Sequence, residues 1–157
     1  MALSQSVQRV KNALAKSGMR FEVVEMSSST LTAEDAASAI GCSVGQIVKS
    51  LIFSAQITQK PILVLASGIN RVSEQAMAEI IGFKISKADP RLVREVTGFA
   101  IGGVPPVGHE QEIETYIDQD LLKFDELWAA AGTPFAVFKL NPKELQKLTK
   151  GKVVSIT

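Results

Sequence analysis

Residues 46–53 read Gln46-Ile47-Val48-Lys49-Ser50-Leu51-Ile52-Phe53, an apolar run that a single lysine interrupts. A second apolar run, Ile62-Leu63-Val64-Leu65-Ala66, follows it along the chain. A short and continuous apolar run is typical of a strand that is buried on both faces. The two runs therefore predict two strands, the second of them fully enclosed by the core.

Helix signals surround these runs. Thr32, Asp89 and Asn141 are side chains that cap helix N-termini, and the last two precede a proline at the first helical position. The predicted helices begin near the N-terminus with Leu3, Val7, Val10 and Leu14 and a stop near Gly18, and continue with residues 32–41, 73–81, 90–96 and 142–149. Further strands are expected at residues 21–25, 135–140 and 153–156. This interleaving predicts one α/β (α+β) domain over residues 1–157 with a mixed sheet.

The composition is that of a globular protein, with 46% hydrophobic and 21% charged residues among 157. Its apolar runs are far too short to cross a membrane, and the first residues lack the pattern of a secretory signal. One cysteine, Cys42, excludes an internal disulfide, so a cytoplasmic setting is expected. The net charge of +1 gives no general attraction for nucleic acid, so no DNA partner is predicted, and any RNA contact must come from a local patch.

Several common catalytic machineries are absent from the sequence. It contains no Gly-x-Ser-x-Gly or His-Glu-x-x-His motif, and one histidine with one cysteine cannot make a usual zinc site. Residues 103–108 have the glycine spacing of a phosphate loop, but His109 replaces its lysine, and Pro105 and Pro106 remove two amide donors. The sequence therefore predicts neither a metal nor a cofactor.

Lys49 is the first feature that could carry function. If the strand begins at or just before Lys49, the two-residue period places this lysine on one face with Leu51 and Phe53. A lysine among apolar neighbours is costly unless it is paired or lies at the edge of a cavity. Two interpretations stay open: a lysine at a strand end that extends to solvent, or an anion-binding lysine at the mouth of a pocket.

The second feature is the segment of residues 98–109, GFAIGGVPPVGH, which contains four glycines and two prolines. Glycine permits positive φ and close backbone approach, whereas proline stiffens a loop. Such a loop can hold a carbonyl oxygen with its amides, or it can be a structural turn. His109 is a candidate general acid or base, and the alternative is a structural or surface histidine.

These motifs together resemble the YbaK/EbsC/ProX family. Residues 32–37, Ile40-Gly41 and residues 46–53 resemble its opening block, and residues 102–108 resemble its Gly-x-x-x-Pro loop, with the motif on Gly102 and Pro106. Ile117-Asp118, Ala131-Gly132 and the closing segment from Leu145 to Val153 follow in the same order. The resemblance covers nearly the whole chain.

The resemblance implies a compact domain with a mixed, barrel-like β-sheet flanked by helices. It also implies a free-standing aminoacyl-tRNA deacylase, similar to the editing domain of bacterial prolyl-tRNA synthetases, which cleaves the ester of a wrong amino acid at the 3′ end of tRNA. A synthetase pocket separates small side chains by only about 1–3 kcal/mol, so a second sieve is needed. Water, the ribose hydroxyl or a substrate thiol would attack, which fits the absence of a protein nucleophile.

The resemblance also implies site residues. Lys49 would bind the phosphate of the terminal nucleotide, and the loop amides would polarise the ester carbonyl. Catalytic roles fall on Lys49, Gly102, Gly103 and Pro106, and substrate contacts on Thr32, Val104, Pro105, Gly108, His109 and Asp118. Thr32 can equally be a helix cap, and Asp118 a turn or cap residue.

The expected partners are the acceptor end of a mischarged tRNA and, as a further option, prolyl-tRNA synthetase. Cysteine-editing relatives tend to carry serine before the motif proline, so Pro105 favours alanine or another small amino acid as the one removed. Two other functions stay open: a non-catalytic module that binds tRNA or a synthetase, and a hydrolase of small acyl esters or aminoacyl adenylates.

Overall fold

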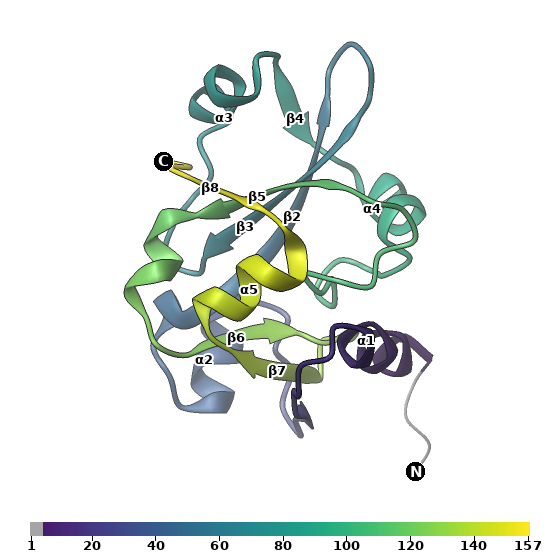
Figure 1. Ribbon diagram of the computed structural model, residues 1–157, viewed down its shortest axis with the longest axis vertical. Coiled ribbons are helices and arrows are strands. Elements are labelled where there is room, and N and C mark those ends of the chain that lie inside the picture. The colour runs from purple at the N-terminus through teal and green to yellow at the C-terminus, as the bar shows by residue number, and fades with distance from the viewer. Residues whose placement is uncertain (1–4) are drawn as a thin grey trace.

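The computed structural model describes residues 5–157, and Figure 1 shows an eight-stranded sheet with helices on both of its faces. The predicted Leu3 lies outside the described residues. The helices are α1 Gln5–Lys16, α2 Ala33–Ile40, α3 Glu74–Ile81, α4 Pro90–Thr97 and α5 Pro142–Thr149, with 3₁₀ turns η1 Val44–Gln46 and η2 Gln119–Lys123. The strands are β1 Val23–Glu25, β2 Ile47–Ala55, β3 Pro61–Ser67, β4 Ile85–Lys87, β5 Glu114–Asp118, β6 Leu127–Ala130, β7 Ala136–Leu140 and β8 Lys152–Val154.

The sheet is mixed, as predicted. Its strand order is β1-β7-β6-β2-β3-β5-β8, and β4 adds to β2 beside this path. The hairpin of β2 and β3 is antiparallel, whereas β2 pairs with β6, β3 with β5, and β5 with β8 in parallel. The path ends at β1 and β8, which do not pair with each other in the described part of the chain, so the sheet stays open.

The strand β2 has an opening along one of its edges. On that edge β6 pairs only with Ile47 and Val48, and β4 pairs only with residues 53–55. No strand of the described chain pairs with this edge between Val48 and Phe53. The sheet therefore contains a gap at the middle of its longest strand.

Helix caps explain where α2, α4 and α5 begin. The side chains of Thr32, Asp89 and Asn141 accept hydrogen bonds from the amides three residues ahead, at 3.0, 2.8 and 2.8 Å. Each bond satisfies one of the free N–H groups of the first helical turn. Gly41 ends α2 in the left-handed region at φ +86°, which glycine adopts without strain. These predicted boundaries are confirmed.

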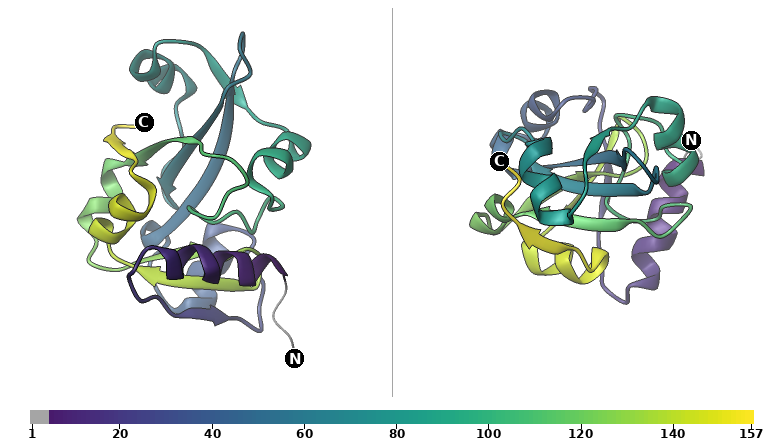
Figure 2. Two further views of the ribbon diagram at one scale, coloured as in Figure 1. Left: turned by 45° about the vertical axis from the view of Figure 1, so that its right-hand side comes forward. Right: turned by 90° about the horizontal axis from the view of Figure 1, so that it is seen from above.

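The core lies on both faces of the sheet. One face packs against α1, α4 and α5, and the other against α2 and α3; Figure 2 shows α1 lying along β7. Leu63 and Leu65 of β3 belong to the first core, and Ile62, Val64 and Ala66 to the second. The prediction of a strand buried on both faces is confirmed.

Three strands had no counterpart in the sequence prediction, namely β4, β5 and β6, which have three to five residues each. The last strand is also displaced: it covers residues 152–154 rather than 153–156. Ile156 is nevertheless buried, and its carbonyl accepts a hydrogen bond from Ser73 instead of joining a ladder. Within residues 5–157, no helix has the length and apolar character needed to cross a membrane.

Candidate functional site

A cavity of about 410 Å³ lies at the gap in the sheet. Its walls come from the start of α2, the middle of β2, the loop after α4, and β6. Residues from both faces of β2 line it, because no strand closes the edge between Val48 and Phe53. A volume of this size lies in the range of small-molecule sites.

Four of the predicted site residues meet in this cavity: Lys49, Thr32, Gly102 and Val104. They come from a strand, a helix cap and a loop that are far apart in the sequence. The other predicted residues do not line it, and these are Gly103, Pro105, Pro106, Gly108, His109 and Asp118.

Lys49 lies on the face of β2 that the two-residue period predicts. Leu51 and Phe53, on the same face as Lys49, pack in the core that contains Met77 of α3. Val48 and Ile52, on the opposite face, pack in the core that contains α1, α4 and α5 residues. The Lys49 Nζ donates a hydrogen bond of 2.6 Å to the main-chain carbonyl of Asn70. Lysine has three such donors, so two remain for a ligand.

The surroundings of Lys49 change its acidity. Burial lowers the pKa of the Lys49 ammonium, and the carboxylates of Glu34 and Asp118 partly oppose this shift. Lys87, which also lines the cavity, lowers the pKa further. The site therefore holds two lysines, an arrangement that favours an anionic ligand.

Asp118 does not line the cavity and is connected to this lysine through Asn70. Its carboxylate is 1% exposed and accepts hydrogen bonds from the Ser67 amide at 3.0 Å and from Asn70 Nδ2 at 2.8 Å. It also caps η2 by accepting from the Asp120 amide at 2.9 Å. Its oxygens are thus occupied inside the protein. This placement fits the cap interpretation, and it gives Asp118 no contact with the cavity.

Two residues of the glycine loop that line the cavity, Gly102 and Val104, have amides that are unpaired within residues 5–157. Gly103 uses its own amide to bond Ala100 O at 3.1 Å, and its carbonyl accepts from Gly132 at 3.0 Å. Among the described residues, the amides of Gly102 and Val104 have no hydrogen-bond acceptor. Gly102 has φ +94°, which favours glycine, and it lies directly under the Leu31 side chain. The turn is therefore held by Gly103, while its neighbours are available to a ligand.

His109 supports the loop and does not face the cavity. Its Nε2 lies 2.7 Å from the Pro105 carbonyl, and because a carbonyl only accepts, Nε2 carries the proton. Burial lowers the pKa of His109, and the charge of Arg9 lowers it further against the opposing effect of the Pro105 bond. His109 thus braces the loop through this hydrogen bond, and its burial favours the neutral imidazole.

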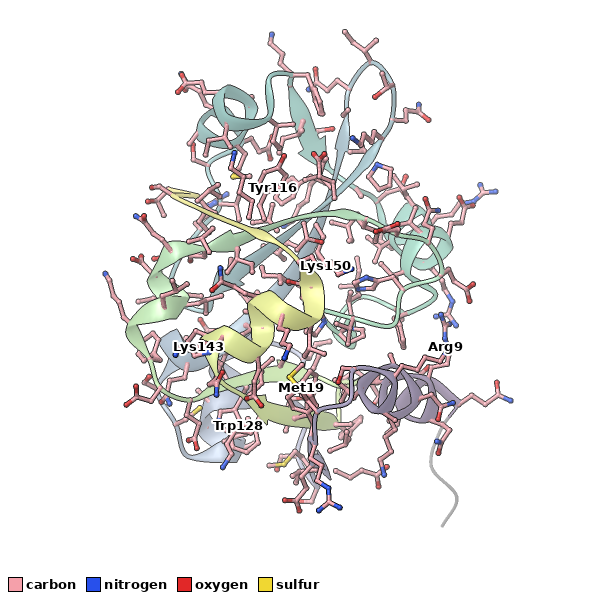
Figure 3. The ribbon with its side chains drawn as sticks, in the orientation of Figure 1. Arg9, Met19, Tyr116, Trp128, Lys143 and Lys150 are labelled. Carbon is pink, nitrogen blue, oxygen red and sulfur yellow. The ribbon has the colours of Figure 1, made fainter. Side chains whose placement is uncertain are left out.

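Arg9 of α1 holds the ends of the same loop, a contact that sequence reasoning missed. Its guanidinium donates to the carbonyls of Gly98 and Gly108 at 3.4 and 3.2 Å and stacks over Phe99, with 4.7 Å to the ring centroid. It also pairs with Glu110 at 3.1 Å. Figure 3 shows Arg9 extending from α1 toward the segment beyond α4. No local motif marks such a contact, because the partners lie about ninety residues away.

Two further cavity residues were missed. In the described chain, Ser50 Oγ and Trp128 Nε1 are the buried side-chain polar atoms without a hydrogen-bond partner, and both residues line the cavity. Figure 3 places Trp128 beside α2. A serine between a lysine and a leucine in an apolar strand was the available signal for Ser50. Residues 5–157 contain no group of three or more His, Cys, Asp or Glu side chains that could hold a metal.

Comparisons with known proteins identify the family. The model of the aminoacyl-tRNA editing domain matches residues 27–148. The uncharacterised protein YwhH of Bacillus subtilis is 34% identical over 94% of both chains. EbsC of Enterococcus faecalis, provisionally assigned as a Cys-tRNA(Pro)/Cys-tRNA(Cys) deacylase, is 25% identical over 81% of this chain and 77% of its own.

A solved structure agrees with these relatives. It is provisionally assigned as a trans-editing enzyme for prolyl-tRNA synthetase and is 47% identical, with a TM-score of 0.93 over 99% of both chains. Sequence and fold thus give the same answer, and the chain belongs to the aminoacyl-tRNA editing domain family.

Proposed function

We propose that this protein is a trans-editing deacylase that hydrolyses the ester of tRNA carrying a small wrong amino acid, with tRNA(Pro) bearing alanine as the first candidate. The observation that carries the proposal is that one cavity is lined by Lys49 and by Gly102 and Val104, two loop residues whose amides have no acceptor among the described residues. A cation can bind the phosphate of the terminal nucleotide, and two amide donors can bind the carbonyl oxygen of the neighbouring ester.

The two amides supply the electrostatic part of the reaction. As water or the ribose hydroxyl attacks the ester, negative charge develops on the carbonyl oxygen. Fixed N–H donors stabilise that charge at little reorganisation cost. The amides of Gly102 and Val104 would take this role, and Gly103 supports it by fixing the turn between them through its bonds with Ala100 and Gly132.

Lys49 supplies the anchoring part. Its two remaining N–H donors would bind the phosphate of the terminal nucleotide, with Asn70 and Asp118 holding the side chain in place. Binding at this anchor places the ester near the amides, and such positioning accounts for much of the rate in reactions without a protein nucleophile.

The support for a small amino acid comes from the cavity. Its wall on the loop side is apolar and made of valine, alanine and isoleucine side chains, including Val93, Val104 and Ala129. Pro105 before the motif proline favours alanine over cysteine by resemblance. The solved structure provisionally assigned as a trans-editing enzyme for prolyl-tRNA synthetase supports tRNA(Pro) as the substrate and prolyl-tRNA synthetase as a proposed partner.

The test is a deacylation assay with purified protein and a panel of charged tRNAs: alanyl-, cysteinyl- and seryl-tRNA(Pro), with prolyl-tRNA(Pro) as the cognate control. We expect rapid hydrolysis of the alanyl species and none of the cognate one. Binding of tRNA or synthetase without hydrolysis of any species would instead indicate a non-catalytic module. Equal hydrolysis of RNA-free alanyl esters would indicate a small-ester hydrolase.

A further inference from the structure

Ser50 carries a buried hydroxyl that the fold itself does not use. Its Oγ has no hydrogen-bond partner among the described residues, and Ser50 lines the cavity. A buried polar group without a partner costs stability, so such groups are rare and tend to mark functional sites.

The main chain of Ser50 faces the same opening. In the β2–β3 hairpin, the Ile47 carbonyl accepts a hydrogen bond from the Gly68 amide, so alternate residues 49, 51 and 53 also turn their main-chain groups toward β3. The N–H and C=O of Ser50 therefore point to the other edge. That edge is unpaired here, because β6 ends its pairing at Val48 and β4 begins at Phe53.

These polar groups stand in an apolar wall. Ser50 shares its face of β2 with Val48 and Ile52, which belong to the core that also contains Val93 and Val104. Val104 of the glycine loop therefore lies on this side as well, whereas Lys49 lies on the opposite face with Leu51 and Phe53. Trp128 aligns with Ile47 and packs with α2, so its indole is on the lysine side.

We propose that the gap between β6 and β4 is an aminoacyl subsite in which Ser50 binds the α-ammonium group of the substrate. This inference rests on the function proposed above. Apart from the ester, the α-ammonium is the one polar group that alanine carries. The hydroxyl and carbonyl of Ser50 both accept hydrogen bonds, as an ammonium requires. The subsite thus selects a free α-amino group over an N-blocked one.

The test measures the coupling between the Ser50 hydroxyl and the α-amino group in a double-mutant cycle. The probes are 3′-alanylamido-3′-deoxyadenosine, whose amide is not an ester, and its N-acetyl derivative. Both are titrated calorimetrically at pH 7.0 into wild type, Ser50→Ala, Ser50→Thr and the control Ser54→Ala. Ser54 lies on the same strand and outside the cavity.

We expect wild type to bind the free amine more tightly than the acetylated probe. A hydrogen bond to a charged group corresponds to about 10- to 100-fold in affinity, so Ser50→Ala should reduce this preference by about tenfold or more. Ser50→Thr should retain it, and Ser54→Ala should leave it unchanged. The melting temperature of Ser50→Ala should equal or exceed that of wild type, because the removed hydroxyl has no partner in the fold.

Three results would overturn the subsite: equal binding of both probes by wild type, no binding of either, or the same loss for both probes in Ser50→Ala. The last result, with a lowered melting temperature, would assign Ser50 a structural role. The deacylation panel of the preceding section uses full tRNA and decides the proposed function separately. A wild type that deacylates but shows no amine preference would contradict this inference alone.

Discussion

Asp118 holds the side chain of Asn70, and the main-chain carbonyl of Asn70 accepts a hydrogen bond from the Lys49 ammonium. A buried carboxylate thus fixes the position of a cation that it does not touch. The connection also joins β5 to β2 across the loop that follows β3. Of these three residues Lys49 lines the cavity, and Asn70 and Asp118 act by holding Lys49.

Replacing Asp118 by asparagine should weaken both folding and activity. The new amide would present N–H groups to the donors of Ser67, Asn70 or Asp120, because one acceptor oxygen is lost. We expect the free energy of unfolding to fall by about 2–4 kcal/mol, measured by urea denaturation. Asp125→Asn, at an exposed position, is the control. A loss below about 0.5 kcal/mol would show that the buried carboxylate is not needed.

His109 should make stability depend on pH. Its pKa in the folded protein lies below the unfolded value of about 6.5, because burial disfavours the imidazolium. The unfolded chain then binds more protons between these two values, so the free energy of unfolding falls as the pH drops below about 6.5. Above that pH the contribution is fully present.

Denaturation at pH 7.5 and pH 5.5 measures this effect. We expect His109→Gln to be less sensitive to acid than wild type, by at most about 1.4 kcal/mol per pH unit. Glutamine can still donate to the Pro105 carbonyl but does not titrate in this range. The same change in the free energy of unfolding with pH in wild type and His109→Gln would mean that His109 has the same pKa in the folded and unfolded chains.

For single residues, the sequence correctly predicted on which face of β2 Lys49 lies, because the two-residue period of a strand is a local property. The sequence could not show that the Gly103 amide donates its hydrogen bond within the turn, to Ala100, or that His109 binds the Pro105 carbonyl. Those facts depend on the conformation of the whole loop. The catalytic and binding roles themselves stay predictions until the variants are measured.

Among the elements, α1 has a role that the family motifs do not reveal. The family model begins at residue 27, whereas Arg9 of α1 bonds the carbonyls of Gly98 and Gly108 on either side of the glycine loop. One guanidinium thereby fixes both ends of the loop whose middle carries the free amides. The planar fork of arginine suits this task, and a lysine cannot make both bonds in the same geometry.

Loosening this contact should slow catalysis without removing any group from the cavity. We expect Arg9→Ala and Arg9→Lys to lower the single-turnover deacylation rate by about tenfold or more, because the loop amides lose their fixed position. Amide hydrogen exchange over residues 98–109 should rise in both variants. Asn12→Ala, on the exposed face of α1, is the control. Unchanged exchange and rate in Arg9→Ala would contradict a role for α1 in the site.

Helices were predicted better than strands, for a physical reason. Thr32, Asp89 and Asn141 mark helix starts through bonds to residues three positions ahead, so the signal is local. The short strands β4, β5 and β6 gain their stability from partners far along the chain. Their own residues carry too little periodicity to reveal them.

In the whole molecule, the cavity exists because β2 is longer than either strand on its outer edge. With β6 at one end and β4 at the other, the middle of β2 opens to the loop after α4 on one face and to α2 on the other. The mixed α/β class followed from the sequence. The gap did not, since it depends on the strand order of the completed sheet.

One comparison of rates bears most directly on this cavity as a deacylase site: single-turnover hydrolysis of alanyl-tRNA(Pro) by wild type, Lys49→Ala and Lys60→Ala. Lys60 is a half-exposed lysine paired with Glu114, away from the cavity, and it controls for the loss of a positive charge. We predict a loss of about 100-fold in Lys49→Ala and little change in Lys60→Ala. Wild-type hydrolysis by a folded Lys49→Ala protein would contradict the site proposed for this chain.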